Sequence, residues 1–134
     1  VDVYLDEQTA AAMRTKFGYC FQAPAGSDYP PIVTEHRLES GRAVRIHGSA
    51  GAITALPFRQ EHGDIASLGF RFGALAYSCD LSGLPDESIA ALQGLDLWVV
   101  DALRYRHQWQ QRCNQIMTQL LRRIGPVPHS AGVR

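Results

Sequence analysis

The segment HGDIASLGFRFGALAYSCD, residues 62–80, constrains the fold more than any other part of the sequence. Two stretches rich in Phe, Leu and Tyr lie on either side of Gly73, which is typical of two strands joined by a turn. A polar residue stands at each end of the segment, His62 with Gly63 at the start and Asp80 at the close. Because antiparallel strands joined by a turn run back along each other, we expect His62 and Asp80 to lie near one another.

The rest of the chain alternates between helical and strand-like patterns, which predicts a layered α/β arrangement with a mixed sheet. Strands are expected near residues 1–5, 33–38, 43–47 and 52–58. The apolar run LDLWVVDAL, residues 95–103, has the pattern of a strand covered on both faces. Helices are expected near residues 7–17, 86–93 and 106–124, the last with an apolar stripe from Trp109 to Ile124.

Local signals mark the ends of two of these helices. Asp6 and Asp86 are suitable N-caps. Gly18 and Gly94 stand where a helix commonly ends. Within the first helix, Met13 and Phe17 are four residues apart, so both are expected to face the core.

Composition excludes several classes of protein. The 134 residues are enough for one domain with a modest core, and the formal net charge of +0 argues against a nucleic-acid or membrane-surface partner held by bulk charge. No stretch reaches the ~20 apolar residues of a membrane span, and VDVYLDEQ does not resemble a secretory signal. Three cysteines without close spacing favour neither a disulfide framework nor a cysteine zinc site. We expect a soluble cytoplasmic protein.

The pattern alone leaves two interpretations of His62 and Asp80. An imidazole and a carboxylate at one edge of a sheet suit zinc, manganese or iron. Alternatively, His62 ends a strand and Asp80 begins a turn with Ser82 and Gly83. Without further information, the second interpretation is favoured.

A family resemblance changes that balance. VYLDEQTAAAMRTKFGYCF and PFRQEHGDIASLGFRFGALAYSCDLSGLPDESIAALQGLDLWVVDALRYR resemble the central and later part of metallo-β-lactamase-fold hydrolases. The branch they resemble contains the phosphoribosyl cyclic phosphodiesterases. The resemblance covers residues 1 to about 106 and implies part of an αββα sandwich with a mixed sheet. It predicts a single domain over residues 1–134 with a divergent tail at 107–134.

In that family the histidine of the His-Gly pair binds a metal, and the aspartate after the AYSCD strand bridges two metals. The resemblance therefore implies that His62 and Asp80 are ligands of a divalent metal, zinc or manganese. The family's His-x-His-x-Asp-His motif occurs nowhere in the 134 residues, so we expect a truncated member with doubtful metal occupancy. In the tail, His107 stands in place of the family's acid/base or phosphate-contacting histidine, and His129 in place of its final metal ligand.

Other polar residues have two interpretations each. Arg71 and Arg104 could bind phosphate or could pair with aspartates, as Arg104 could with Asp101. His36 and His47 are expected to be ordinary surface or turn residues, and Cys79 a small buried side chain rather than a nucleophile.

Two functions from different classes follow. The first is a metal-dependent hydrolase of the phosphodiesterase type, weak or inactive as this chain alone and acting on a phosphate-ester small molecule. The second is a non-catalytic oligomeric or interaction protein derived from the same fold. In either case an uncovered apolar sheet face predicts a homodimer.

Overall fold

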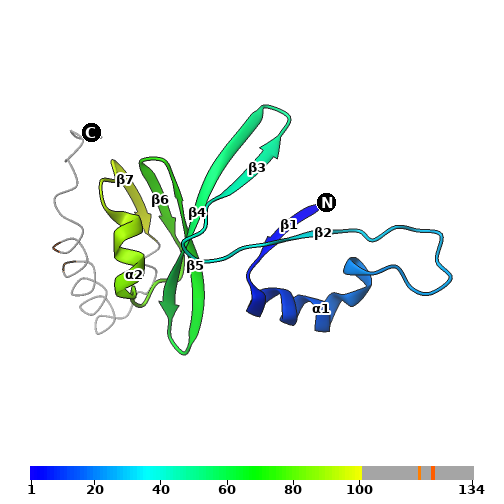
Figure 1. Cartoon of the computed structure of the whole chain (residues 1–134). Coiled ribbons are helices and arrows are strands. Elements are labelled where there is room, and N and C mark those ends of the chain that lie inside the picture. Colours follow the sequence, from blue (N-terminus) through cyan, green and yellow to red (C-terminus); the bar gives the residue numbers. More distant parts are fainter. Residues whose placement is uncertain (101–117, 119–121, 123–134) are drawn as a thin grey trace, which may run out of the picture. The chain divides into compact units, whose positions relative to one another are not determined.

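The computed structural model describes residues 1–100 together with Thr118 and Arg122 (Figure 1). The chain forms two compact units, Val1–Glu39 and Ser40–Arg134. Each unit contains both helix and strand, which agrees with the expected α/β class. The helix expected over 106–124 lies outside the described residues apart from those two positions. The single domain and the divergent tail therefore stay predictions.

The first unit pairs a short parallel sheet with one helix. Strand β1 (Asp2–Leu5) lies parallel to β2 (Thr34–Arg37), and helix α1 (Glu7–Phe21) connects them. The predicted cap is confirmed, because the Thr9 amide donates to Asp6 Oδ1 at 2.7 Å.

The far end of α1 differs from the prediction. Phe17 has φ −132° and ψ 36°, so the helix kinks there and continues to Phe21 instead of ending before Gly18. The Phe17 side chain is 40% exposed, and the expectation that it faces a core is wrong. Phe17 and Met13 still share one side of α1, since both line an open apolar hollow together with residues of β1.

The second unit is a five-stranded mixed sheet in the order β3-β4-β5-β6-β7 (Figure 1). Its strands are β3 (Val44–Gly48), β4 (Gly51–His62), β5 (Ile65–Phe72), β6 (Leu75–Ser78) and β7 (Leu97–Val100). Neighbours are antiparallel except β6 and β7, which are parallel. The connection between them contains α2 (Asp86–Ile89) and the 3₁₀ turn η1 (Ala90–Leu92).

The ends of this helical connection confirm one prediction and correct another. Pro85 occupies the N-cap position and Asp86 is the first helical residue, so the prediction of Asp86 as the cap is wrong. Proline fits at this boundary because its ring fixes φ near the value the backbone needs there. Gly94 has φ +67° just beyond η1, which confirms it as the stop.

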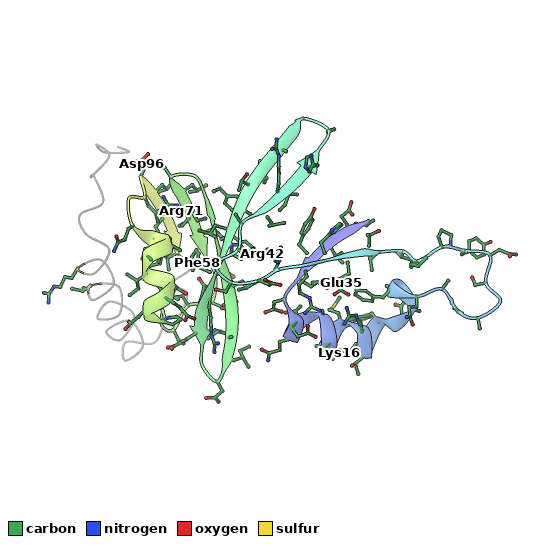
Figure 2. The ribbon with its side chains drawn as sticks, in the orientation of Figure 1. Lys16, Glu35, Arg42, Phe58, Arg71 and Asp96 are labelled. Atoms are coloured by element: carbon green, nitrogen blue, oxygen red, sulfur yellow. The ribbon has the colours of Figure 1, made fainter. Side chains whose placement is uncertain are left out.

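The core of the second unit lies on one face of the sheet. Phe58 on β4, labelled in Figure 2, packs with Ala76 of β6 and with residues of the helical connection; the full cluster is Phe58, Ala76, Leu84, Ile89, Leu92 and Leu95. Trp98 of β7 packs against this cluster and donates from Nε1 to Ser78 Oγ at 3.0 Å.

The opposite face of the same strands is partly exposed. Leu75 of β6 is paired in register with Leu97 of β7, Val99 lies on the same side of β7, and the three are 38–55% exposed. We call these three residues the open apolar face. The expectation that residues 95–103 are covered on both faces is therefore wrong for the described part, up to Val100. An apolar run alone does not reveal which face of its strand is covered.

Candidate metal site

His62 is the last residue of β4 and lies on its core-facing side. Side chains alternate along a strand, so His62 shares a face with Phe58 and Gln60, both of which are buried. His62 pairs with Ile65 at the start of β5, and Gly63, with φ +62°, opens the turn between them. The second turn, at Gly73, pairs Phe72 with Leu75 and confirms the hairpin expected there.

Asp80 reaches the same end of the sheet by a different route. Strands β4 and β6 both run antiparallel to β5, so their C-terminal ends lie at the same end of the sheet. After β6 the chain turns along the end of β4, where the Ser82 amide donates to Glu61 O at 2.7 Å and the Glu61 amide to Gly83 O at 2.9 Å. The Gly63 amide also donates to Ser82 Oγ at 3.0 Å. These bonds bring the segment that carries Asp80 beside the end of the strand that carries His62.

The backbone of Asp80 is unusual. Its φ is +53°, and among the described residues it is the one non-glycine with positive φ. Aspartate tolerates this left-handed region better than most residues, but the conformation still has a cost. Such conformations concentrate at functional sites, where surrounding contacts hold them. The Sγ of the adjacent Cys79 lies 3.5 Å from Asp80 Oδ2.

The donor types at this edge suit a divalent metal, but their number falls short. Zinc sites use three or four protein ligands, drawn from imidazoles, thiolates and carboxylates. Within residues 1–100, Thr118 and Arg122, no three His, Cys, Asp or Glu side chains cluster closely enough to hold a metal. His107 and His129 lie outside the described residues. The described part of the chain therefore offers an incomplete ligand set.

The sequence did not predict a role for Gln60, a buried amide in the same region as the two predicted ligands. Gln60 is 0% exposed, and its Nε2 donates to Ser67 Oγ at 3.1 Å and to the Cys79 carbonyl at 3.0 Å. Its Oε1 is buried without a hydrogen-bond partner among the described residues. The one signal in the sequence was a polar residue at a core-facing position, between Phe58 and His62 in the strand alternation.

Arg71 has a structural role that matches neither interpretation from the sequence. Its Nε donates to Gly73 O at 2.7 Å, and its Nη1 to Ala91 O and Gln93 O at 2.9 and 2.8 Å. Arg71, labelled in Figure 2, thus binds the turn at Gly73 and the carbonyls at the end of the helical connection. It pairs with Leu56 through the register of β4 and β5, far along the strand from His62. Asp101 and Arg104 lie outside the described residues.

The two histidines expected at the surface are there. His47 is exposed on β3. His36 stacks on Tyr4 with ring centroids 4.7 Å apart and lies 2.6 Å from Asp2 Oδ1. This hydrogen bond, together with the charge of His36, lowers the pKa of the Asp2 carboxyl.

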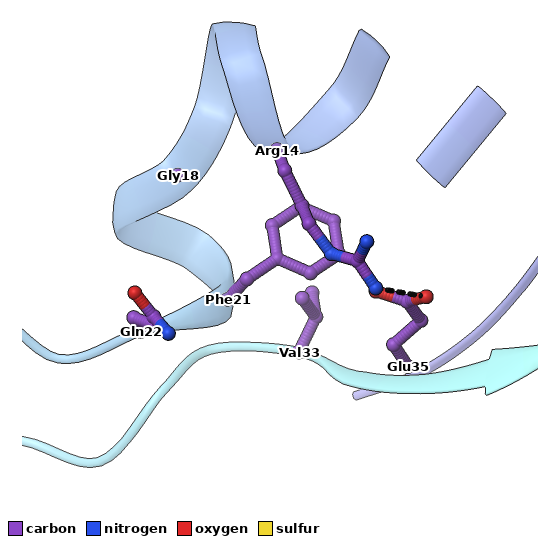
Figure 3. A pocket seen from close by; sticks show the side chains of 6 residues that line it. All are labelled: Arg14, Gly18, Phe21, Gln22, Val33 and Glu35. Atoms are coloured by element: carbon purple, nitrogen blue, oxygen red, sulfur yellow. Dashed lines mark hydrogen bonds and ion pairs between the residues drawn. The ribbon is translucent and has the colours of Figure 1, made fainter. Parts of the chain in front are cut away.

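The first unit contains a cavity of about 340 Å³ lined by Arg14, Gly18, Phe21, Gln22, Val33 and Glu35 (Figure 3). The guanidinium of Arg14 is already paired, since its Nη2 lies 2.6 Å from each carboxylate oxygen of Glu35. None of the predicted ligands lines this cavity.

Known proteins give an independent comparison. The family model described as "Beta-lactamase superfamily domain" matches residues 1–129. The chain belongs to this superfamily. The crystal structure of a new diphosphatase from the PhnP family is similar, with a TM-score of 0.66 and 30% identity over 90% of this chain and 43% of that one. These matches confirm the metallo-β-lactamase fold and support a hydrolase-like function. Members of this fold usually bind divalent metals.

A second relative is an octanoyltransferase of Porphyromonas gingivalis (strain ATCC BAA-308 / W83). It is 23% identical over 133 residues, which are 98% of this chain and 25% of that protein. The chain thus spans less than half of each relative. No helix among the described residues combines the length and the apolar character needed to cross a membrane.

Proposed function

We propose that this chain carries part of the active site of a metal-dependent hydrolase for phosphate esters of the phosphodiester type. The observation that supports it most is the pairing of Glu61 with Ser82 and Gly83, which brings the Asp80 segment to the end of β4 at His62. The similarity to a diphosphatase gives further support.

In this proposal the metal ligands are His62, Asp80 and His129, with zinc or manganese as the ion. His107 is proposed as the acid/base or phosphate-contacting residue. A bound divalent ion supplies a water of lowered pKa and stabilises charge on a phosphoryl group. A folded edge that already holds an imidazole and a carboxylate loses little entropy when such an ion binds.

We further propose that the 134-residue chain alone is weak or inactive. It contains no His-x-His-x-Asp-His motif, and two described donors are fewer than the three that a catalytic zinc needs. Metal binding and activity would then both require ligands in addition to His62 and Asp80.

A titration with zinc and manganese tests the metal site. A ligand that binds only the folded protein stabilises it by about 2.7 kcal/mol at a concentration 100 times its Kd, so the melting temperature should rise. His62→Ala and Asp80→Ala should each abolish that rise. His47→Ala, which removes an exposed histidine on β3, should keep it. Equal responses in all three variants would refute the site, and hydrolysis of an aryl phosphodiester with added metal measures the activity.

A second candidate is a non-catalytic protein that acts through self-association. The open apolar face supports it, because soluble monomers rarely expose contiguous apolar patches beyond a few hundred Å². We propose a homodimer in the cytoplasm, with no nucleic-acid or membrane partner. The formal net charge of +0 agrees with a partner that is not held by bulk charge.

A further inference from the structure

Gln60 occupies a position where an amide is costly. It is 0% exposed on the core-facing side of β4, between Phe58 and His62 in the alternation. Burying an amide without full hydrogen bonding costs free energy, and Oε1 has no partner among the described residues. An apolar side chain of the same length would avoid that cost, which indicates that the amide has a role beyond filling the core.

The contacts of Gln60 determine which way its amide points. The Cys79 carbonyl can only accept, so the atom 3.0 Å from it must be the nitrogen of the amide. The same nitrogen donates its second hydrogen to Ser67 Oγ. Both hydrogens of the amide group are therefore donated, one to Ser67 on β5 and one to Cys79, the residue before Asp80.

The neighbouring strand leaves space for this side chain. A Cβ on Gly69 would lie 2.6 Å from Gln60 Oε1 and 2.4 Å from two ring carbons of Phe58. Gly69 pairs directly with Phe58 across β4 and β5. A glycine at this point of β5 thus lets the buried amide reach across the sheet toward Cys79.

The bond to Cys79 acts directly on the unusual backbone of Asp80. The carbonyl of Cys79 belongs to the peptide group whose nitrogen is that of Asp80, so fixing this carbonyl fixes the plane of that peptide. The φ of +53° at Asp80 is a rotation about the next bond along the chain. The segment is therefore held on both sides, by Gln60 at Cys79 and by Glu61 at Ser82 and Gly83.

We propose that Gln60 is a positioning residue, which holds Asp80 in its left-handed conformation and thereby directs its carboxylate to the edge beside His62. This inference rests on the proposed function, in which Asp80 is a metal ligand. Hydrogen-bonding partners of metal ligands typically change metal affinity by about 10- to 100-fold when removed.

The test compares Gln60→Met with Ser67→Ala. The first variant keeps the length and loses both donated bonds, whereas the second removes the acceptor on β5 and leaves the bond to Cys79. The first readout is hydrogen exchange at the Ser82 amide, measured relative to amides in the β4–β5 hairpin. We expect about tenfold faster relative exchange in Gln60→Met and little change in Ser67→Ala. If Gln60→Met does not fold, Gln60→Leu gives the same test, because leucine is apolar, is no longer than glutamine and donates no hydrogen bond.

The second readout is the zinc dissociation constant, obtained by competition with a chelating dye. Gln60→Met should weaken zinc binding by about 10- to 100-fold, and Ser67→Ala should leave it near the parent value. If the parent binds zinc, parent-like affinity in Gln60→Met overturns the proposal. If the parent binds no zinc, the proposed function fails, and exchange at Ser82 alone decides whether Gln60 positions this segment. Unchanged exchange there overturns it.

Discussion

Gly69 shows how tightly one position on β5 is constrained. The ring of Phe58 occupies the place of a Cβ at this residue, at 2.4 Å, so any side chain must displace the ring or the backbone. Gly69→Ala should therefore lower the free energy of unfolding by about 1–3 kcal/mol, measured by urea denaturation. Gly18→Ala is the matched control, because nothing lies within 4 Å of its Cβ in α1. Alanine there should be neutral or stabilise by up to about 1 kcal/mol. Equal effects at the two glycines would contradict this packing.

The carboxyl of Asp2 has a lowered pKa because it is hydrogen-bonded to His36. Its contribution to stability is present above the ordinary aspartate pKa and is lost as the pH falls through the lowered value. His36→Ala should move the pKa of Asp2 up toward the ordinary value, as followed by NMR titration of its carboxyl carbon. His47→Ala should not change it. A low pKa that persists in His36→Ala would exclude the imidazole as its cause.

At this scale the sequence predicted some roles and missed others for a physical reason. His62 ends β4 and Asp80 follows shortly after the end of β6, and the hairpin pattern was enough to predict that these two segments meet at one end of the sheet. Apart from Gly73, which is close to Arg71 in the chain, the partners of Gln60 and Arg71 lie 7 to 22 positions away and are reached only after the sheet has formed. A single sequence carries no local signal for contacts of that kind.

The helical connection between β6 and β7 owes its place to a few buried side chains. Leu92 at the end of η1 is 0% exposed and belongs to the cluster around Phe58. Leu92→Ala should leave a cavity and cost about 2–5 kcal/mol of unfolding free energy. Ile53→Ala removes a side chain of β4 that is 57% exposed and lies outside the open apolar face, so it should stay within about 0.5 kcal/mol of the parent. Thermal and urea denaturation measure both, and a small effect at Leu92 would mean that the helical connection does not form the core cover described.

Element types were predicted better than element ends. Alternation and turn glycines identified each strand from β1 to β7, but β4 is longer than expected, extending to His62. β4 extends beyond Phe58 because its residues up to His62 pair with β5. This pairing is a tertiary contact, and the local sequence of β4 does not predict it. Similarly, the helix pattern of α1 contained no sign of the kink at Phe17.

On the scale of the whole molecule, the chain corresponds to less than half of each relative it resembles. The family resemblance rather than the hydrophobic pattern predicted the fold, since several short strands and two helices fit many mixed α/β folds. The same resemblance predicted His62 and Asp80 as metal ligands, and that assignment stays a prediction. The remaining ligands were predicted at positions 107 and 129, outside the described residues.

The open apolar face leads to a prediction about assembly. Leu75, Leu97 and Val99 expose apolar side chains in one block across β6 and β7. Covering apolar surface gains about 25 cal/mol per Å², and a second copy packed about a two-fold axis would cover both faces at once. We therefore expect a homodimer with an interface of roughly 2,000 Å² or more, and the segment from Trp109 to Ile124, outside the described residues, is our candidate for an exchanged or interfacial element.

Sedimentation equilibrium at low micromolar concentration measures this association. The parent should have the mass of a dimer. Leu97→Lys should shift the measured mass toward that of a monomer. In the dimer the lysine ammonium would lose its hydration in the centre of an apolar interface, and this desolvation opposes association. Ile53→Lys is the matched control. Ile53 is 57% exposed, lies in the part of β4 that pairs with β3, and is outside the open apolar face. That variant should remain dimeric. A well-folded monomer in the parent would show that the chain needs no second copy, and dissociation by both lysines would show that the interface is not the face formed by β6 and β7.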